Sequence, residues 1–280
     1  MELYLGASDE NISESYQQTC LPAFTGHLAE ELRSLPSLTS LQLRYRHAIR
    51  ASDIRALGTL TGLTGLTALT IQGDHGLPRP ELGRLDFLDW AKQDQLEEAN
   101  RPVALGELTS LTSLHLTDCS TYMMEEVEEC WCGLQWRAPS LAKLTALTSL
   151  HLGGECWDIN DEQMEEISKL TALTYVHLEC WWESEEPDMR LWTLASRLPG
   201  LTHLHVTGGD SVSDDGLRAI ASLTGLAHLH LRYFHRVTDE GVATLRSLTA
   251  LKSLELTECD NVITRGDYGA AAAARTGLQV

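Results

Sequence analysis

Residues 201–206 read LTHLHV, and residues 226–231, which follow 25 positions later, read LAHLHL. Alternate side chains of a β-strand point to opposite faces, so Leu204 and Val206 share one face while His203 and His205 share the other. Self-similarity at a period of about 20 to 50 residues indicates a solenoid of stacked units. This stretch therefore predicts a strand that is buried on one face and that recurs along the chain.

The pattern LxxLxxLxxLxL, or a close form of it, occurs eight times in the sequence. One such unit cannot bury its apolar face alone, whereas stacked units form a continuous core. Each copy ends in a strand-like pair of apolar residues: Leu41 and Leu43, Leu69 and Ile71, Leu114 and Leu116, Leu150 and Leu152, Val176 and Leu178, Leu204 and Val206, Leu229 and Leu231, and Leu254 and Leu256.

Four segments between these strands align without gaps and predict helices: IRASDIRALGTL (49–60), INDEQMEEISKL (159–170), VSDDGLRAIASL (212–223) and VTDEGVATLRSL (237–248). Ser213 and Thr238, each followed by Asp, are typical of helix N-caps. Apolar residues three positions apart, such as Leu217, Ile220 and Leu223, then mark one helical face.

This pattern resembles the leucine-rich repeat family, and within it the cysteine-containing class found beside F-boxes. Cys119 and Cys259 fit the cysteine position of that class, and VTDEGV (237–242) fits its helix start. LTGLTGL (60–66) and LTSLTSL (108–114) also resemble bacterial internalin-like repeats, and we identify no F-box segment before the first repeat. The resemblance covers roughly residues 32–263 and implies a fold rather than a function.

The expected fold is an α/β, right-handed leucine-rich-repeat solenoid (horseshoe) of about eight repeats, with a parallel concave sheet and convex helices. We expect residues 1–31 to form an N-terminal cap and residues 32–263 to form the repeat domain. Insertions are expected at 73–104 and 120–140, and residues 264–280 should form a C-terminal cap or a frayed tail.

Histidine occupies the outward position between the two core residues of five successive strands, at His115, His151, His177, His205 and His230. At the strand spacing of about 4.8 Å these rings form a ladder, and the middle rings should resist protonation because neighbouring charges repel. Duplication of one repeat explains such a ladder without any function, whereas a contact surface, a pH switch or metal capture would use it. Other outward residues that we expect to bind a partner are His203, His228, Tyr175, Glu179, Arg232 and Glu255.

Tryptophan and acidic residues gather just after the strands of neighbouring copies. Trp157, Trp181 and Trp182 should lie at the rim of the concave face, close to runs of glutamate such as Glu183, Glu185 and Glu186. Buried Trp is common, but Trp is also enriched in binding hot spots. An acidic, Trp-bearing rim would suit a basic segment of a partner protein.

The 280 residues carry a formal charge of −19, which argues against nucleic acid or an anionic membrane as the partner. The seven irregularly spaced cysteines argue against a disulfide framework, and we expect a cytoplasmic or nuclear protein without a signal peptide. We find no nucleophile motif, phosphate loop or paired CxxC units, so we expect no enzyme activity, no cofactor and no structural metal.

The sequence thus predicts a monomeric protein-interaction module that uses the concave face and the acidic Trp-rich rim. One alternative is the substrate-recognition subunit of a ubiquitin ligase, which the cysteine-containing resemblance implies. The other is a pH- or metal-responsive sensor that uses the histidine ladder.

Overall fold

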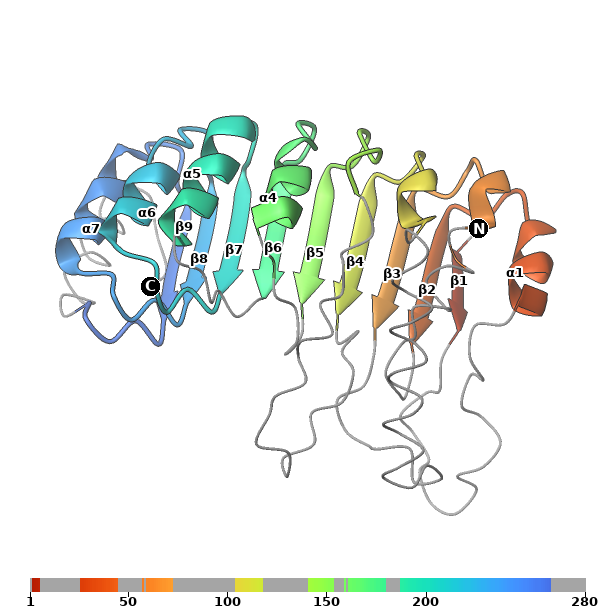
Figure 1. Ribbon diagram of the computed structural model, residues 1–280, viewed down its shortest axis with the longest axis horizontal. Coiled ribbons are helices and arrows are strands. Elements are labelled where there is room, and N and C mark those ends of the chain that lie inside the picture. Colours follow the sequence, from red (N-terminus) through yellow and green to blue (C-terminus); the bar gives the residue numbers. More distant parts are fainter. Residues whose placement is uncertain are drawn as a thin grey trace, which may run out of the picture. The chain divides into compact units, whose positions relative to one another are not determined.

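The computed structural model describes residues 2–5, 26–44, 57, 59–72, 104–117, 141–153, 159, 161–179 and 187–262. The chain divides into two compact units, Met1–Ala146 and Leu147–Val280, and each is described by itself. In both units short parallel strands alternate with helices, which confirms the expected α/β organisation (Figure 1).

Within its described residues, the first unit contains four parallel strands that pair in chain order. The strands are β1 (Glu2–Leu5), β2 (Ser40–Arg44), β3 (Ala68–Gln72) and β4 (Ser113–Thr117). The connecting segments contain α1 (Gly26–Arg33) and the short 3₁₀ helices η1 (Thr59–Gly62) and η2 (Ala104–Glu107). The predicted boundary between the cap and the first repeat, at residues 31 and 32, falls inside α1.

In the described part of the second unit, five parallel strands pair in chain order. They are β5 (Ser149–Gly153), β6 (Tyr175–Glu179), β7 (His203–Thr207), β8 (His228–Arg232) and β9 (Ser253–Thr257). The helices are α4 (Asp161–Ser168), α5 (Pro187–Arg197), α6 (Asp214–Ile220) and α7 (Asp239–Thr244), followed by η4 (Leu245–Ser247). Helices α4 to α7 lie side by side along these strands (Figure 1).

Leucines fill the space between strands and helices in each unit. Leu204 and Val206 of β7 and Leu217 and Ile220 of α6 are at most 2% exposed, and equivalent residues of the other repeats are buried alike. The burial pattern alternates along β2, β3, β7 and β8, so the residue between the two core positions faces away from the helices. The predicted strand orientation is therefore confirmed.

A threonine before several of the strands links neighbouring repeats. The Thr67 hydroxyl donates to the carbonyl of Thr39, and Thr174 and Thr202 donate in the same way to Thr148 and Thr174. The same threonine carbonyls also accept backbone N–H groups from the next repeat, at about the usual hydrogen-bond length. The recurrent LT dipeptide of the sequence thus supplies hydrogen bonds between repeats at the start of these strands.

The predicted N-caps are confirmed. The Ser213 hydroxyl accepts from the N–H of Asp215 at the start of α6, and the Thr238 hydroxyl accepts from Glu240 at the start of α7. Each capping residue is itself held by an aspartate of the preceding repeat. The backbone N–H and the hydroxyl of Ser213 donate to Asp188 at 2.9 and 2.6 Å, and those of Thr238 donate to Asp214 at 2.8 Å each.

Several predictions fall outside the residues that the structure describes. The insertion at 120–140 and the tail at 264–280 lie there entirely, and only Ala104 of the insertion at 73–104 is described. Of the cysteine positions, Cys259 is described, and it is fully buried just after the end of β9, as expected for a small apolar residue.

Candidate functional site

Two rows of rings cross the second unit on the strand face opposite the helices. The strand register aligns His151, His177, His205 and His230, and we call these four residues the first row. It also aligns Tyr175 with His203 and His203 with His228, and we call these three the second row. The two rows together form the imidazole face. Because parallel pairing repeats the same register from strand to strand, one residue type at one position becomes a continuous row.

The rings of the first row stack closely. Their centroids are 3.8 Å apart between His151 and His177, 3.7 Å between His177 and His205, and 4.0 Å between His205 and His230. These centroid distances are shorter than the strand separation of about 4.8 Å, so the rings lie closer together than the strands that carry them. The stack fixes the ring orientations and leaves little room between the faces.

The second row is more open and borders a hollow. His203 and His228 stack at 4.4 Å, whereas Tyr175 lies tilted at 5.8 Å from His203. A shallow hollow of about 200 Å³ is lined by all three residues of the second row, by His205 and His230 of the first row and, on β9, by Ser253 and Glu255. A partner side chain could enter there and contact several rings at once.

Hydroxyl groups contact the edges of several rings. Thr202 Oγ1 lies 2.9 Å from Nδ1 of His203, and Thr207 Oγ1 lies 3.2 Å from Nε2 of His205. Thr257 Oγ1 lies 3.3 Å from Nε2 of His230. The Thr202 hydroxyl already donates to the Thr174 carbonyl, so Nδ1 of His203 donates to it. The contacts of Thr207 and Thr257 are compatible with either neutral tautomer of the imidazole, because a hydroxyl can donate or accept.

The pKa values of several rings are lowered. Burial lowers the pKa of His205 from 6.5 to about 3, and the neighbouring His177 and His230 act in the same direction. Burial, followed by His228 and Lys252, lowers the pKa of His203. Burial also lowers the pKa of His230, although the Glu255 carboxylate opposes it. The lowered pKa of His205 has the direction expected for a middle ring, but burial is its main cause and repulsion between neighbouring rings comes second.

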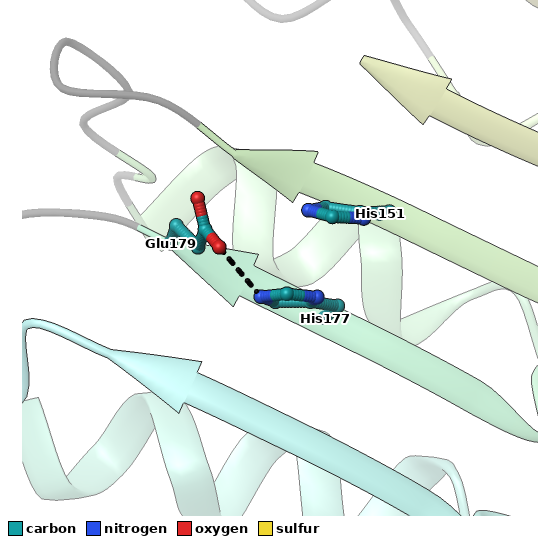
Figure 2. Close-up of side chains that lie close together, drawn as sticks. All are labelled: His151, His177 and Glu179. Atoms are coloured by element: carbon teal, nitrogen blue, oxygen red, sulfur yellow. Dashed lines mark ion pairs between the residues drawn. The ribbon is translucent and has the colours of Figure 1, made fainter. Parts of the chain in front are cut away.

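A carboxylate stands at one end of the first row. Oε1 of Glu179 lies 2.9 Å from Nε2 of His177, an ion-pair distance, although it is not in line for a regular hydrogen bond (Figure 2). This polar contact with the His177 imidazole lowers the pKa of Glu179 to about 2, against burial, which raises it. His151, His177 and Glu179 each offer one ligand atom, and these atoms lie within 4.8 Å of one another.

The structure brings most of the predicted binding residues into one surface. Six histidines, Tyr175, Glu179, Arg232 and Glu255 all lie on the strand face of the second unit. His115 occupies the equivalent position of β4 in the first unit. Trp157, Trp181 and Trp182, the tryptophans of the predicted rim, lie outside the described residues.

Sequence reasoning did not include Thr202, Thr207 and Thr257 in this site. Thr207 and Thr257 occupy the strand position two residues after the histidine or Glu255, so the alternation of the strand could have indicated them. Thr202 precedes its strand and contacts His203 through the local backbone geometry, which the alternation does not predict.

Comparisons with known proteins agree with this fold. The family described as "Leucine Rich repeat" matches residues 199–221. An internalin (inlF) of Listeria monocytogenes is 18% identical, with a TM-score of 0.50, and the match covers 88% of this chain and 62% of that one. Internalin C2 of the same species is 22% identical over 81% of this chain and 75% of that one, with a TM-score of 0.42. A leucine-rich-repeat protein of Leptospira interrogans is 15% identical over 90% and 57%, with a TM-score of 0.44.

Together with the strand and helix arrangement, the match to the repeat family and to the first internalin confirms the predicted leucine-rich-repeat fold. This chain spans less than two thirds of that internalin, 62% of its length. A search of curated proteins returned no match. In the part of the chain that the structure describes, none of the helices is both long and apolar enough to cross a membrane.

Proposed function

We propose that this leucine-rich-repeat protein is a protein-interaction module that binds its partner through the imidazole face of β5 to β9. Proteins built from stacked repeats commonly present such extended surfaces to other proteins. The observation that carries the proposal is the hollow of about 200 Å³ that both rows of rings line. Proteins of this fold generally act as interaction scaffolds, and we propose no catalytic activity for the chain.

The stacked rings favour binding for an energetic reason. Immobilising a flexible side chain at an interface costs about 0.5 to 1.5 kcal/mol. The rings of His203 and His228 already stack at 4.4 Å, and those of the first row at 3.7 to 4.0 Å, so little freedom remains to be lost. Neutral imidazoles also offer both donors and acceptors without the desolvation cost of a charge.

Charge favours a partner that carries a basic segment. The chain has a formal charge of −19, and Glu255 at the edge of the hollow is 61% exposed. An exposed carboxylate beside a ring surface would steer a Lys or Arg toward the hollow and would disfavour a phosphate backbone. The acidic Trp-rich rim at Trp157, Trp181 and Trp182 would extend this surface, and we propose that the chain acts as a monomer.

The experiment that tests the proposal uses two variants of the chain as baits in quantitative affinity capture. One variant has three substitutions and the other has two. The first carries Tyr175→Ala, His203→Ala and His228→Ala, which remove the second row. The matched control carries Met189→Ala and Trp192→Ala on α5, where both side chains are exposed, at 54% and 45%. Each protein that the wild-type chain captures is then purified, and its binding to the wild type and to both variants is measured directly.

We expect the second-row variant to lose the partner and the α5 variant to retain it, with unchanged circular dichroism for both. Equal retention by the two variants would show that the imidazole face is not the binding surface. Loss with the α5 variant alone would place the interface on the helices instead.

A specific observation favours one second candidate, the substrate-recognition subunit of a ubiquitin ligase. Cys259 is buried at the position where the cysteine-containing class has its cysteine, and Thr238 caps α7 as the VTDEGV segment predicts. We propose this role as the alternative, and co-purification with a ligase adaptor tests it. The buried Cys259 forms no disulfide, which also suits the reducing cytoplasm, the compartment we propose.

A further inference from the structure

The end of the first row differs chemically from the rest of the imidazole face. In the row of residues two positions after the histidines, Glu179 of β6 aligns with Thr207, Thr207 with Arg232 and Arg232 with Thr257. A carboxylate therefore stands beside His177, whereas a guanidinium stands at the β8 end. A cation is attracted to the first position and repelled from the second.

Three side chains meet at this carboxylate end. His151 comes from β5, and His177 and Glu179 come from β6, with all three on the face away from the helices (Figure 2). Their ligand atoms lie within 4.8 Å of one another, and the described residues contain one such group of three. Two ligands that share one ion at about 2.1 Å lie at most about 4.2 Å apart. The rings of His151 and His177 stack with their planes 18° apart, so both rings must turn out of the stack when an ion binds, because the nitrogen lone pairs lie in the ring planes.

The donor set defines the class of ion. Two imidazole nitrogens and one carboxylate oxygen suit Zn²⁺ and its borderline neighbours Co²⁺, Ni²⁺ and Cu²⁺, while Mg²⁺ and Ca²⁺ prefer oxygen ligands throughout. A set of two histidines and one glutamate leaves the fourth position of a tetrahedral ion open to water or to another ligand.

Neighbouring groups partly enclose the nitrogen ligands. Nε2 of both His151 and His177 is shielded from solvent, and the His177 residue is 8% exposed. His205 stacks on His177 at 3.7 Å with the planes 13° apart. Surrounding groups of this kind control the access of solvent to a metal site.

We propose that His151, His177 and Glu179 form a binding site for one divalent transition-metal ion of the zinc class. The ion bonds to one nitrogen of each neutral imidazole, whose ring proton then sits on the other nitrogen, and it keeps the Glu179 carboxylate as its negatively charged ligand. This site does not depend on the proposed partner, because it is complete within β5 and β6 of the chain itself.

The test uses the full chain without a polyhistidine tag, stripped with a chelator. Binding of Zn²⁺ is measured by isothermal titration calorimetry at about pH 7.5, where imidazoles are mostly neutral. Co²⁺ serves as a second probe, because its visible absorption reports the ligand geometry. The variants are Glu179→Gln, which keeps the shape of the side chain, and His151→Ala. The matched control is His228→Ala, which removes a stacked imidazole of the second row.

We expect one Zn²⁺ per wild-type chain and a loss of affinity of at least about tenfold in Glu179→Gln and in His151→Ala. His228→Ala should bind within about twofold of the wild type, because it removes none of the three ligands. Equal weakening in all three variants would mean scattered binding to surface imidazoles and would overturn the proposal. So would the absence of stoichiometric binding by the wild type, and circular dichroism of each variant excludes misfolding as the cause.

Discussion

The imidazole rings of His177 and His205 lie face to face, with their centroids 3.7 Å apart and their planes 13° from parallel. Two positive charges at that distance repel by about 1 kcal/mol in water and by about 4 kcal/mol at the effective dielectric constant of a protein surface. The stack is therefore stable when the rings are neutral and loses stability as they take up protons.

The lowered pKa of His205 predicts that the protein becomes less stable in mild acid. The unfolded chain binds a proton near pH 6.5, whereas the folded chain binds it only near a pKa of about 3. Between these values the unfolded state holds more protons, so the free energy of unfolding falls as pH falls below about 6.5. Between pH values of about 7.5 and 5.5, His205→Gln should therefore lose less free energy of unfolding than the wild type. The difference should be about 1 kcal/mol or less, since solvent screens the site.

Urea unfolding curves at the two pH values measure this difference. His235→Gln is the control, because His235 lies in the loop after β8, away from the imidazole face, next to Asp210 and Asp260. An equal acid-induced loss in wild type and His205→Gln would contradict the assignment of this pH dependence to the stack.

The bonds from Asp214 to the next repeat predict a large effect of its removal. Asp214→Ala leaves the N–H and hydroxyl of Thr238 without their carboxylate partner, which should cost about 1 to 3 kcal/mol. Asp215→Ala is a matched control, because Asp215 sits at the same helix start and its carboxylate pairs with the exposed Arg218. Its loss should stay below about 1 kcal/mol. Chemical denaturation measures the free energy of unfolding of both variants. Equal losses would show that the hydrogen bonds to Thr238 contribute nothing to stability.

The close approach of Gly209 to Phe234 predicts a steric penalty for any side chain there. A Cβ atom at Gly209 would lie 2.5 Å from the fully buried Phe234 ring, so Gly209→Ala should destabilise the protein by about 1 to 3 kcal/mol. Gly225→Ala is the control, because its Cβ would meet only the Leu201 carbonyl at 3.8 Å.

Combining Gly209→Ala with Phe234→Leu should destabilise the protein by less than the sum of the two single changes, because the smaller side chain makes room. Thermal unfolding of the four chains forms a complete cycle. Strict additivity would show that the two residues do not compete for the same space.

The sequence predicted the elements that depend on local periodicity. The recurrence of Leu204 and Val206, and of Leu229 and Leu231, indicated which strand residues are buried and that His205 and His230 face outward. Ser213 and Thr238 identified the helix starts for the same reason, since capping is a contact within one turn. Strand β1 was not predicted, although its Leu3-Tyr4-Leu5 has the spacing of the later strands, because no complete repeat precedes it.

Contacts between residues about 25 positions apart could not be predicted from the pattern alone. That His177 and His205 approach to 3.7 Å depends on ring tilt, which the strand spacing does not determine. That Glu179 contacts His177 depends on a side-chain rotation within one strand. That Asp188 and Asp214 bind the capping residue of the following repeat depends on how neighbouring repeats stack, which the pattern of a single helix start does not indicate.

The hydrogen bonds of those aspartates all run the same way along the second unit. Asp188 holds Ser213 of the following repeat, and Asp214 holds Thr238 of the one after that, always from the N-terminal neighbour to the C-terminal one. If a C-terminal repeat unfolds locally, the aspartate of the repeat before it only exchanges its hydrogen bonds to that repeat for hydrogen bonds to water. If an N-terminal repeat opens, the next helix loses the group that orders its first turn. Local opening should therefore remain confined when it begins at the C-terminal end, and it should spread to the adjoining repeats when it begins upstream.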